Sequence, residues 1–201
     1  MMRQRFVIPV VSTLAALLLT GCAAPNGGGS ASVADRVPAA AFSAGLAAER
    51  HADYVEAEAR YRDAAAWGNA GGQARLALLY ATGRGALVKD DNEAARLFRL
   101  AADQGNALGQ TGLGVFYASG RGGVAQNDRE AVRLLRLSAD QGDELGEINL
   151  GICYAAGLFG LPKDIPEAER LFRLAIAQDG AAEVIVMLYR KDLRSFPRPD
   201  Q

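Results

Sequence analysis

The sequence repeats itself with a period of 37 residues, and this repeat limits the possible folds more than any other feature. Segments 73–106, 110–143 and 147–180 align without gaps. The matching positions include a tyrosine (Tyr80, Tyr117, Tyr154), a glycine (Gly83, Gly120, Gly157) and an alanine (Ala94, Ala131, Ala168). A unit of this length forms one small motif that cannot bury its apolar face alone. The units must therefore stack on one another in a solenoid.

Each unit predicts two helices. In the first, Leu113, Phe116 and Tyr117 share one face at helical spacing, and Gly120 is suited to the left-handed residue that ends a helix. The second begins with an Asx-x-x-Glu pattern four times along the chain: Asp53–Glu56, Asp90–Glu93, Asn127–Glu130 and Asp164–Glu167. This is a capping box, in which the Asx side chain binds the N3 amide and the glutamate reaches back to the N-cap amide. We therefore expect an all-α fold, a right-handed α-solenoid of stacked antiparallel helix pairs.

The motif Leu113-Gly114-x-x-Tyr117-x-x-Gly120-x-Gly122, followed by Glu130-Ala131 and Ser138-Ala139-x-Gln141-Gly142, resembles the Sel1-like repeat, a relative of the tetratricopeptide repeat. The resemblance implies repeats at 70–106, 107–143 and 144–180, preceded by a tetratricopeptide-like helix pair at 39–69. Residues 181–192 resemble a closing helix, and 193–201 form a tail. The third unit departs from the motif, because Phe159 stands where Gly85 and Gly122 stand and Leu158 replaces Arg84 and Arg121.

Residues 1–21 are predicted to be a signal peptide. Arg3 and Arg5 precede an apolar run that is too short to span about 30 Å of hydrocarbon as a helix. The run ends in Leu19-Thr20-Gly21-Cys22, which resembles the bacterial lipobox. That resemblance implies cleavage before Cys22 and a covalent lipid on it, and Ala23 favours the outer membrane, facing the periplasm. Residues 22–38 are predicted to be a flexible tether. The alternative is an ordinary signal peptide whose cleavage region contains a cysteine.

Composition and motifs argue against nucleic-acid binding and against catalysis. The net charge of −1 provides no basic surface for nucleic acid. His51 is the only histidine and lies in a predicted turn, so neither a histidine-based triad nor a histidine-rich metal site can form. Cys153 aligns with the core positions Leu79 and Phe116, which indicates a small buried hydrophobic residue. We expect no enzyme, no metal and no cofactor other than the lipid on Cys22.

The recurring charged residues have structural interpretations. The capping box accounts for the glutamates at the start of the second helices. Arg99, Arg136 and Arg173 are expected to form a solvated row on the convex face, paired with acids four residues away. Binding of a phosphate or a glycan by this row is the less favoured alternative.

Two surfaces are candidates for binding a partner. In tetratricopeptide-like stacks the first helices line the concave face, and the resemblance implies an apolar groove that would suit a peptide or helix of a protein partner. Its residues are Ala74, Leu78, Thr111, Val115, Ile148 and Ile152. The alternative is that a tightly curled solenoid buries them itself. The second surface is a loop with two extra apolar residues, Leu158 and Phe159, and packing against the terminal helix is its alternative.

The sequence thus predicts a membrane-anchored periplasmic scaffold for protein–protein interaction. Its partners would be proteins of the bacterial envelope, and its role would be to support the assembly or regulation of an envelope complex. The alternative function is a lipoprotein that binds peptidoglycan or an envelope polysaccharide.

Overall fold

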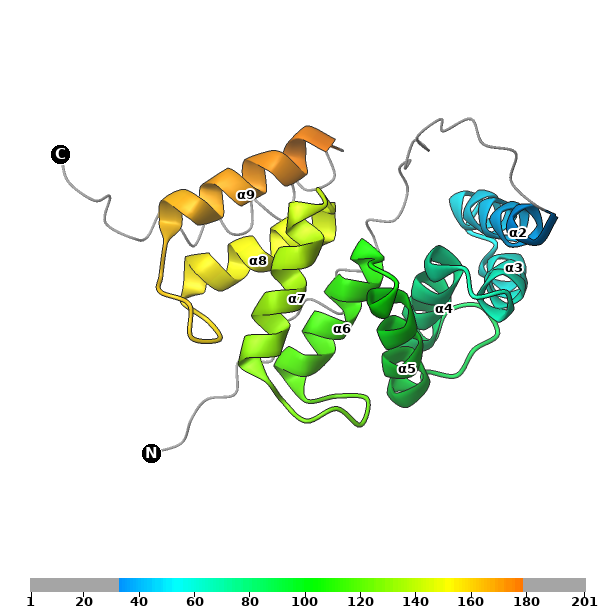
Figure 1. The fold of residues 1–201 in the computed structure, drawn as a ribbon, viewed down its shortest axis with the longest axis horizontal. Helices are drawn as coiled ribbons and strands as arrows, with labels where there is room; N and C mark the ends of the chain where they lie inside the picture. The colour runs from blue at the N-terminus through cyan, green and yellow to red at the C-terminus, as the bar shows by residue number, and fades with distance from the viewer. Residues whose placement is uncertain (1–32, 179–201) are drawn as a thin grey trace.

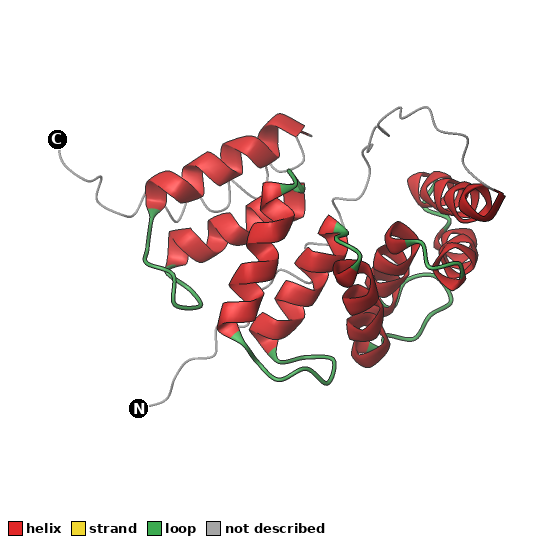
Figure 2. Cartoon of the chain, in the orientation of Figure 1, coloured by secondary structure: helices red, strands yellow, loops and turns green. Residues whose placement is uncertain are grey.

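The computed structural model describes residues 33–178, and this part of the chain is helical with no strand. Its helices are α2 (Val33–Arg50), α3 (Tyr54–Ala66), α4 (Ala70–Thr82), α5 (Asp91–Asp103), α6 (Ala107–Ser119), α7 (Asp128–Asp140), α8 (Glu144–Ala156) and α9 (Ile165–Gln178). Helices that follow one another in sequence pack side by side, and α2 and α9 lie at opposite ends of the array (Figures 1 and 2). The predicted all-α solenoid of stacked helix pairs is confirmed.

The Asx residue caps the second helices as the Asx-x-x-Glu pattern predicts. The glutamate of the pattern has a different role. Asn127 Oδ1 accepts from the amide of Glu130 at 3.1 Å, and Asp53, Asp90 and Asp164 do the same in their units. The Glu130 carboxylate does not return to the N-cap amide. It binds Arg133 one turn further on, with Nη2 2.6 Å from Oε1. The glutamate half of the predicted capping box is therefore wrong.

The reason lies in the loop that precedes each second helix. The N-cap amide of Asn127 donates to the carbonyl of Tyr117 at 3.0 Å, and Asp90 and Asp164 donate in the same way to Tyr80 and Tyr154. Because the amide is already satisfied, the glutamate is available for an ion pair with the arginine three residues later. The same bond ties the last turn of each first helix to the start of the second.

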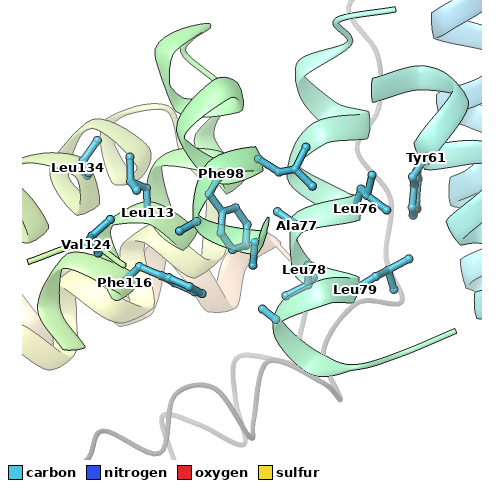
Figure 3. Packing of buried hydrophobic residues seen from close by; sticks show 14 of the residues in the cluster. Tyr61, Leu76, Ala77, Leu78, Leu79, Phe98, Leu113, Phe116, Val124 and Leu134 are labelled. Carbon is cyan, nitrogen blue, oxygen red and sulfur yellow. The ribbon is translucent and has the colours of Figure 1, made fainter. Parts of the chain in front are cut away.

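Within each unit a large side chain of the second helix packs over a small residue of the first. A Cβ placed on Gly114 of α6 would lie 3.2 Å from the carbonyl oxygen of Ala131 and 3.3 Å from Leu135 Cδ2. A Cβ on Gly151 of α8 would lie 2.7 Å from the Phe172 ring. Phe98 occupies the equivalent position of α5 and is fully enclosed in the core that Figure 3 shows, together with Ala77, Leu113 and Phe116.

Successive units lie closest along their first helices. In addition to its neighbours in sequence, α6 contacts α4 on one side and α8 on the other. No comparable contact joins the second helices α5 and α7. The first helices therefore form the inner side of the stack, and the second helices diverge on the outer side.

Two local features differ from the sequence analysis. Helix α2 begins at Val33, within the segment expected to be the tether, and includes Pro38. The alanines that follow Pro38 favour a helix strongly, which compensates for one missing hydrogen bond. In the third unit Phe159 keeps a left-handed conformation (φ 56°) where the other units have glycine. The signal peptide at 1–21, Cys22, the closing helix at 181–192 and the tail at 193–201 lie outside the described residues.

We expect Gly114→Leu to destabilise the protein by about 1–3 kcal/mol, because the new side chain must displace Leu135 or the backbone of α7. This loss exceeds the gain of up to about 1 kcal/mol in helix propensity. Urea unfolding of both proteins measures the difference. Ala59→Leu, on the exposed side of α3, is the control and should change stability by less than about 0.5 kcal/mol. Equal stability of the Gly114→Leu variant and the wild type would contradict the assigned helix contact.

Candidate functional site

The six residues predicted to line a concave groove are almost entirely buried. Ala74, Leu78, Thr111, Ile148 and Ile152 are between 0 and 6% exposed, and only Val115 is half-buried. The prediction of an open apolar groove at these residues is therefore wrong. The alternative given with it, that the solenoid buries them itself, describes the structure.

The contacts of Leu78 and Thr111 explain why these two side chains are buried. Leu78 belongs to the core that joins α3, α4, α5 and α6. The Thr111 hydroxyl lies 2.7 Å from Ser138 Oγ and 3.2 Å from Asp143 Oδ2, which connects α6 to the N-cap of α8. Thr111 is thus part of a buried polar network that holds two units together, and it is not free to bind a partner.

The two predicted surfaces meet at one small cavity. Val115, Ile152 and Phe159 line it together with Cys153. Its volume is about 20 Å³, which is room for no more than a water molecule. The concave side between α6 and α8 therefore offers no space for a ligand at these residues.

The predicted exposed loop is also partly packed away. Leu158 and Phe159 are both half-buried, and they pack against an apolar cluster of α7, α8 and α9 that includes Leu135, Leu150 and Leu171. In the second unit the residue equivalent to Leu158 is Arg121, which makes a bidentate ion pair with Asp91 at 2.7–2.9 Å. The third unit thus replaces an ion pair with apolar packing.

Neither Cys153 nor His51 is placed for catalysis or metal binding. Burial raises the pKa of the Cys153 thiol to about 12, so the thiol stays protonated and unreactive at neutral pH. His51 is exposed in the turn between α2 and α3. Between residues 33 and 178, no three His, Cys, Asp or Glu side chains gather as a metal site would require.

The outer side has a hollow between α5 and α7, with α6 as its floor. Its volume is about 450 Å³, within the range of about 300–1,000 Å³ that is usual for ligand sites. The buried side chains of Leu113 and Leu134 form an apolar base. The polar lining residues are Arg99, Asp103, Gln110, Tyr117, Glu130 and Arg133. The sequence predicts the arginines on this face but not the hollow, because the hollow depends on how far α5 and α7 diverge.

The repeat places equivalent residues between the other second helices, but their arginines are engaged. Arg62 Nη2 lies 3.3 Å from the Tyr80 hydroxyl and also pairs with Glu58 at 3.0 Å. Arg136 Nη2 lies 3.1 Å from the Tyr154 hydroxyl. Arg173 pairs with Glu169, as the expectation of an acid four residues away required. Arg99 has no ion pair with Asp103, and Arg136 has none with Asp140, so that expectation is wrong at both arginines.

Two other charges of the hollow, Arg133 and Glu130, are paired with each other. The Arg133 guanidinium binds both oxygens of Glu130 at 2.6 and 2.8 Å, and this hydrogen bonding lowers the pKa of Glu130 in spite of its partial burial. The same bond raises the pKa of Arg133, and the nearby Tyr117 adds to the effect. The pair therefore remains ionised and close to neutral as a unit at physiological pH.

One carboxyl of the third unit is held in an unfavourable environment. Burial, and then the charge of Asp143, raise the pKa of Glu147 above its ordinary value. Glu147 Oε2 accepts from Gln178 Nε2 at 3.0 Å. In the earlier units a glutamine occupies this position, and Gln110 accepts from Gln141 at 2.7 Å in the same way. Glu147 is therefore a charged substitute in an amide pair that recurs along the stack.

Comparison with known proteins agrees with the repeat and with the geometry. The model of the Sel1 repeat matches residues 70–106, 107–143 and 145–180. The chain belongs to the Sel1 repeat family. Sel1 repeats are generally scaffolds for protein–protein interaction. A search of the curated proteins found no match.

Two solved structures are similar to this Sel1 repeat protein. A Sel1 repeat protein from Oxalobacter formigenes is 26% identical, with a TM-score of 0.60 over 71% of this chain and 58% of that chain. The protective antigen c5321 of uropathogenic Escherichia coli is 27% identical, with a TM-score of 0.40 over 70% of this chain and 38% of that chain. The chain thus spans less than two thirds of each of these two proteins. None of the helices described between residues 33 and 178 is long and apolar enough to cross a membrane.

We expect Glu147→Gln to stabilise this Sel1 repeat protein at neutral pH. The pKa of the Glu147 carboxyl is raised in the folded state. Such a group lowers the free energy of unfolding of the protein as pH rises above the unfolded pKa of about 4.3. The variant lacks this loss, so the difference in melting temperature should be largest near pH 7 and vanish below about pH 4. Gln110→Glu places the same carboxyl in the preceding unit and should have the opposite effect. A Glu147→Gln variant that is less stable than the wild type at pH 7 would contradict the assignment.

Proposed function

We propose that this chain is a lipid-anchored scaffold that binds a protein partner in the bacterial periplasm and supports the assembly or regulation of an envelope complex. Three arguments support the proposal: the exposed apolar row on the second helices, the sequence around Cys22, and the use that the fold makes of its titratable groups.

The observation that carries the proposal is a row of exposed leucines on the outer side. Leu100, Leu137 and Leu174 are 39%, 39% and 42% exposed, and they occupy the same position in α5, α7 and α9. A single exposed leucine is common on protein surfaces. Its recurrence at equivalent positions of three stacked helices gives a regular apolar row beside the hollow, and this is typical of a surface that binds another protein.

The membrane anchor is supported by the sequence Leu19-Thr20-Gly21-Cys22 and by the position of the first described helix. Residues 23–32 separate Cys22 from the start of α2 at Val33. A fully extended chain of this length reaches at most about 36 Å. A lipid on Cys22 would therefore keep the repeats close to the membrane surface, within reach of membrane-bound partners. Because Ala23 follows Cys22, we assign the anchor to the outer membrane, with the repeats in the periplasm.

A role without catalysis is supported by the titratable groups between residues 33 and 178. The glutamates at the start of α5, α7 and α9 bind arginines, and their pKa values are lowered by those bonds. A general acid or base for catalysis at neutral pH needs a pKa near 7. These carboxyls are shifted in the opposite direction, and Cys153 is protonated and buried. Glu147, whose pKa is raised, is buried and bound to Gln178 within the stack.

Lipidation can be tested directly on cells. We expect Cys22→Ser to leave an uncleaved precursor and to abolish labelling by a clickable palmitate analogue. Cys153→Ser is the matched control, because it removes the only other cysteine and should leave labelling intact. Labelling is read by in-gel fluorescence after membrane fractionation. Labelling that persists in Cys22→Ser would exclude the lipoprotein assignment.

The scaffold role predicts a protein partner that depends on the leucine row. In-cell crosslinking of the full chain, followed by quantitative mass spectrometry, should recover one dominant protein. A Leu100→Glu/Leu137→Glu/Leu174→Glu variant should lose it, since these side chains are exposed and charge there opposes apolar contact. Val88→Glu is the control, because Val88 is exposed in the loop between α4 and α5 and does not belong to the row. Circular dichroism confirms that the variants remain folded.

The alternative function is distinguished by sedimentation with purified cell-wall sacculi. A protein scaffold should remain in the supernatant. Saturable binding to sacculi or to an envelope polysaccharide, together with no protein recovered by crosslinking, would overturn the proposal in favour of a glycan-binding lipoprotein.

A further inference from the structure

Arg99 distinguishes the hollow between α5 and α7 from the surfaces of the neighbouring units. The arginines at its equivalent positions, Arg62, Arg136 and Arg173, are each bound to a tyrosine hydroxyl or a glutamate. Arg99 is exposed, and within residues 33–178 it makes neither an ion pair nor a hydrogen bond. Its planar guanidinium therefore has its donors available at the rim of a hollow, in the geometry that binds a carboxylate through two bonds.

The rest of the rim leaves Arg99 as the one group that favours an anion. Arg133 is neutralised by the bidentate pair with Glu130. Asp103, one turn after Arg99 on α5, is an exposed acid that offsets part of the charge of Arg99, so the hollow attracts no more than one negative charge. The hollow is thus complementary to a single carboxylate placed at Arg99, and not to a polyanion such as a nucleic acid or a cluster of phosphates.

The apolar residues around Arg99 specify what should accompany that carboxylate. Leu137 stands at the edge of the hollow with 39% of its surface exposed, and Leu113 and Leu134 form its base. The row of exposed leucines continues beyond the hollow to Leu100 and Leu174. An apolar side chain next to an acidic one satisfies both features. Aromatic platforms for stacking a sugar are few here, since Tyr117 is the one aromatic residue lining the hollow and is half-buried.

We propose that the hollow between α5 and α7 docks a segment of a protein partner, with an aspartate or glutamate carboxylate bound by Arg99 and an adjacent apolar side chain packed against Leu137. This inference rests on the proposed scaffold function and assigns its contact site to the outer side of the stack, at the junction of the first and second repeats. Arg99 provides specificity for the acid, and the leucines provide most of the buried apolar area.

The test begins with random peptides displayed on phage. They are selected on the full chain purified in mild detergent and counter-selected on its Arg99→Gln variant. Arg99 is exposed and unpaired, so the variant should melt at the same temperature as the wild type. We expect the enriched peptides to share an acidic residue beside a large apolar one. A selection that yields no enriched peptide, or peptides without an acid, overturns the proposal.

Binding of one enriched peptide is then measured by fluorescence anisotropy. Arg99→Gln should weaken it about tenfold, and replacing the acid of the peptide with its amide should have a similar effect. The two changes together should cost little more than either alone, which shows that they remove the same interaction. Arg173→Gln is the matched control, because Arg173 is an exposed, paired arginine at the equivalent position of α9. Its effect should stay within about twofold.

Failure of the carboxylate site at Arg99 can be distinguished from failure of the scaffold function. If crosslinking recovers a partner that depends on the leucine row but counter-selection on Arg99→Gln leaves no acid-containing peptide enriched, the carboxylate site is wrong and the scaffold stands. If soluble muropeptides bind in an Arg99-dependent way and no peptide does, both proposals fail in favour of a glycan ligand. If no partner is recovered and no peptide is enriched, both proposals fail.

Discussion

The structure depends on one size relationship that recurs in each Sel1 unit: a large side chain of the second helix packs over a small residue of the first. Leu135 lies over Gly114 and Phe172 over Gly151, so close that a Cβ on either glycine would be within 3.3 Å of the opposing side chain. The helices approach this closely because the residue of the first helix is a glycine in the second and third units and an alanine, Ala77, in the first. Since the relationship recurs with the period of the sequence, it fixes the geometry of every unit, and the stack follows from it.

Close contact along the first helices decides which surfaces remain available. Contacts of α6 with α4 and α8 draw the units together on the inner side, where Ala74, Leu78, Ile148 and Ile152 become core residues. The second helices must then diverge, and space opens between α5 and α7. A shallow curvature would have reversed this arrangement, with an open concave groove and a closed outer side. The outer hollow and the buried groove are therefore two consequences of the same packing.

The sequence predicts the features that depend on neighbouring residues and recur in each unit. It does not predict the features that depend on how two separate segments are placed relative to each other. The Asx N-caps were predictable because an Asx side chain binds an amide three residues away. The role of Glu130 was not, because it depends on whether the N-cap amide of Asn127 is already bound by Tyr117, on another helix. The fate of the groove residues and the existence of the hollow likewise depend on the angle between units. The period of the apolar residues predicts that the units stack, but it does not determine the angle between them.

Three nearly equal units give the fold, so specificity must come from the positions at which they differ. Leu158 takes the place of the arginine that binds Asp91 in the second unit, and the third loop packs by apolar contact instead. Glu147 puts an ionisable group into a pair that is formed by two amides elsewhere. Arg99 is the same residue type as Arg136, yet Arg136 is bound to a tyrosine and Arg99 is not. A partner that contacts only the repeated residues could bind at any unit. Of the three differences only Arg99 is exposed on the outer side, so Arg99 would distinguish the hollow from the equivalent surfaces of the other units.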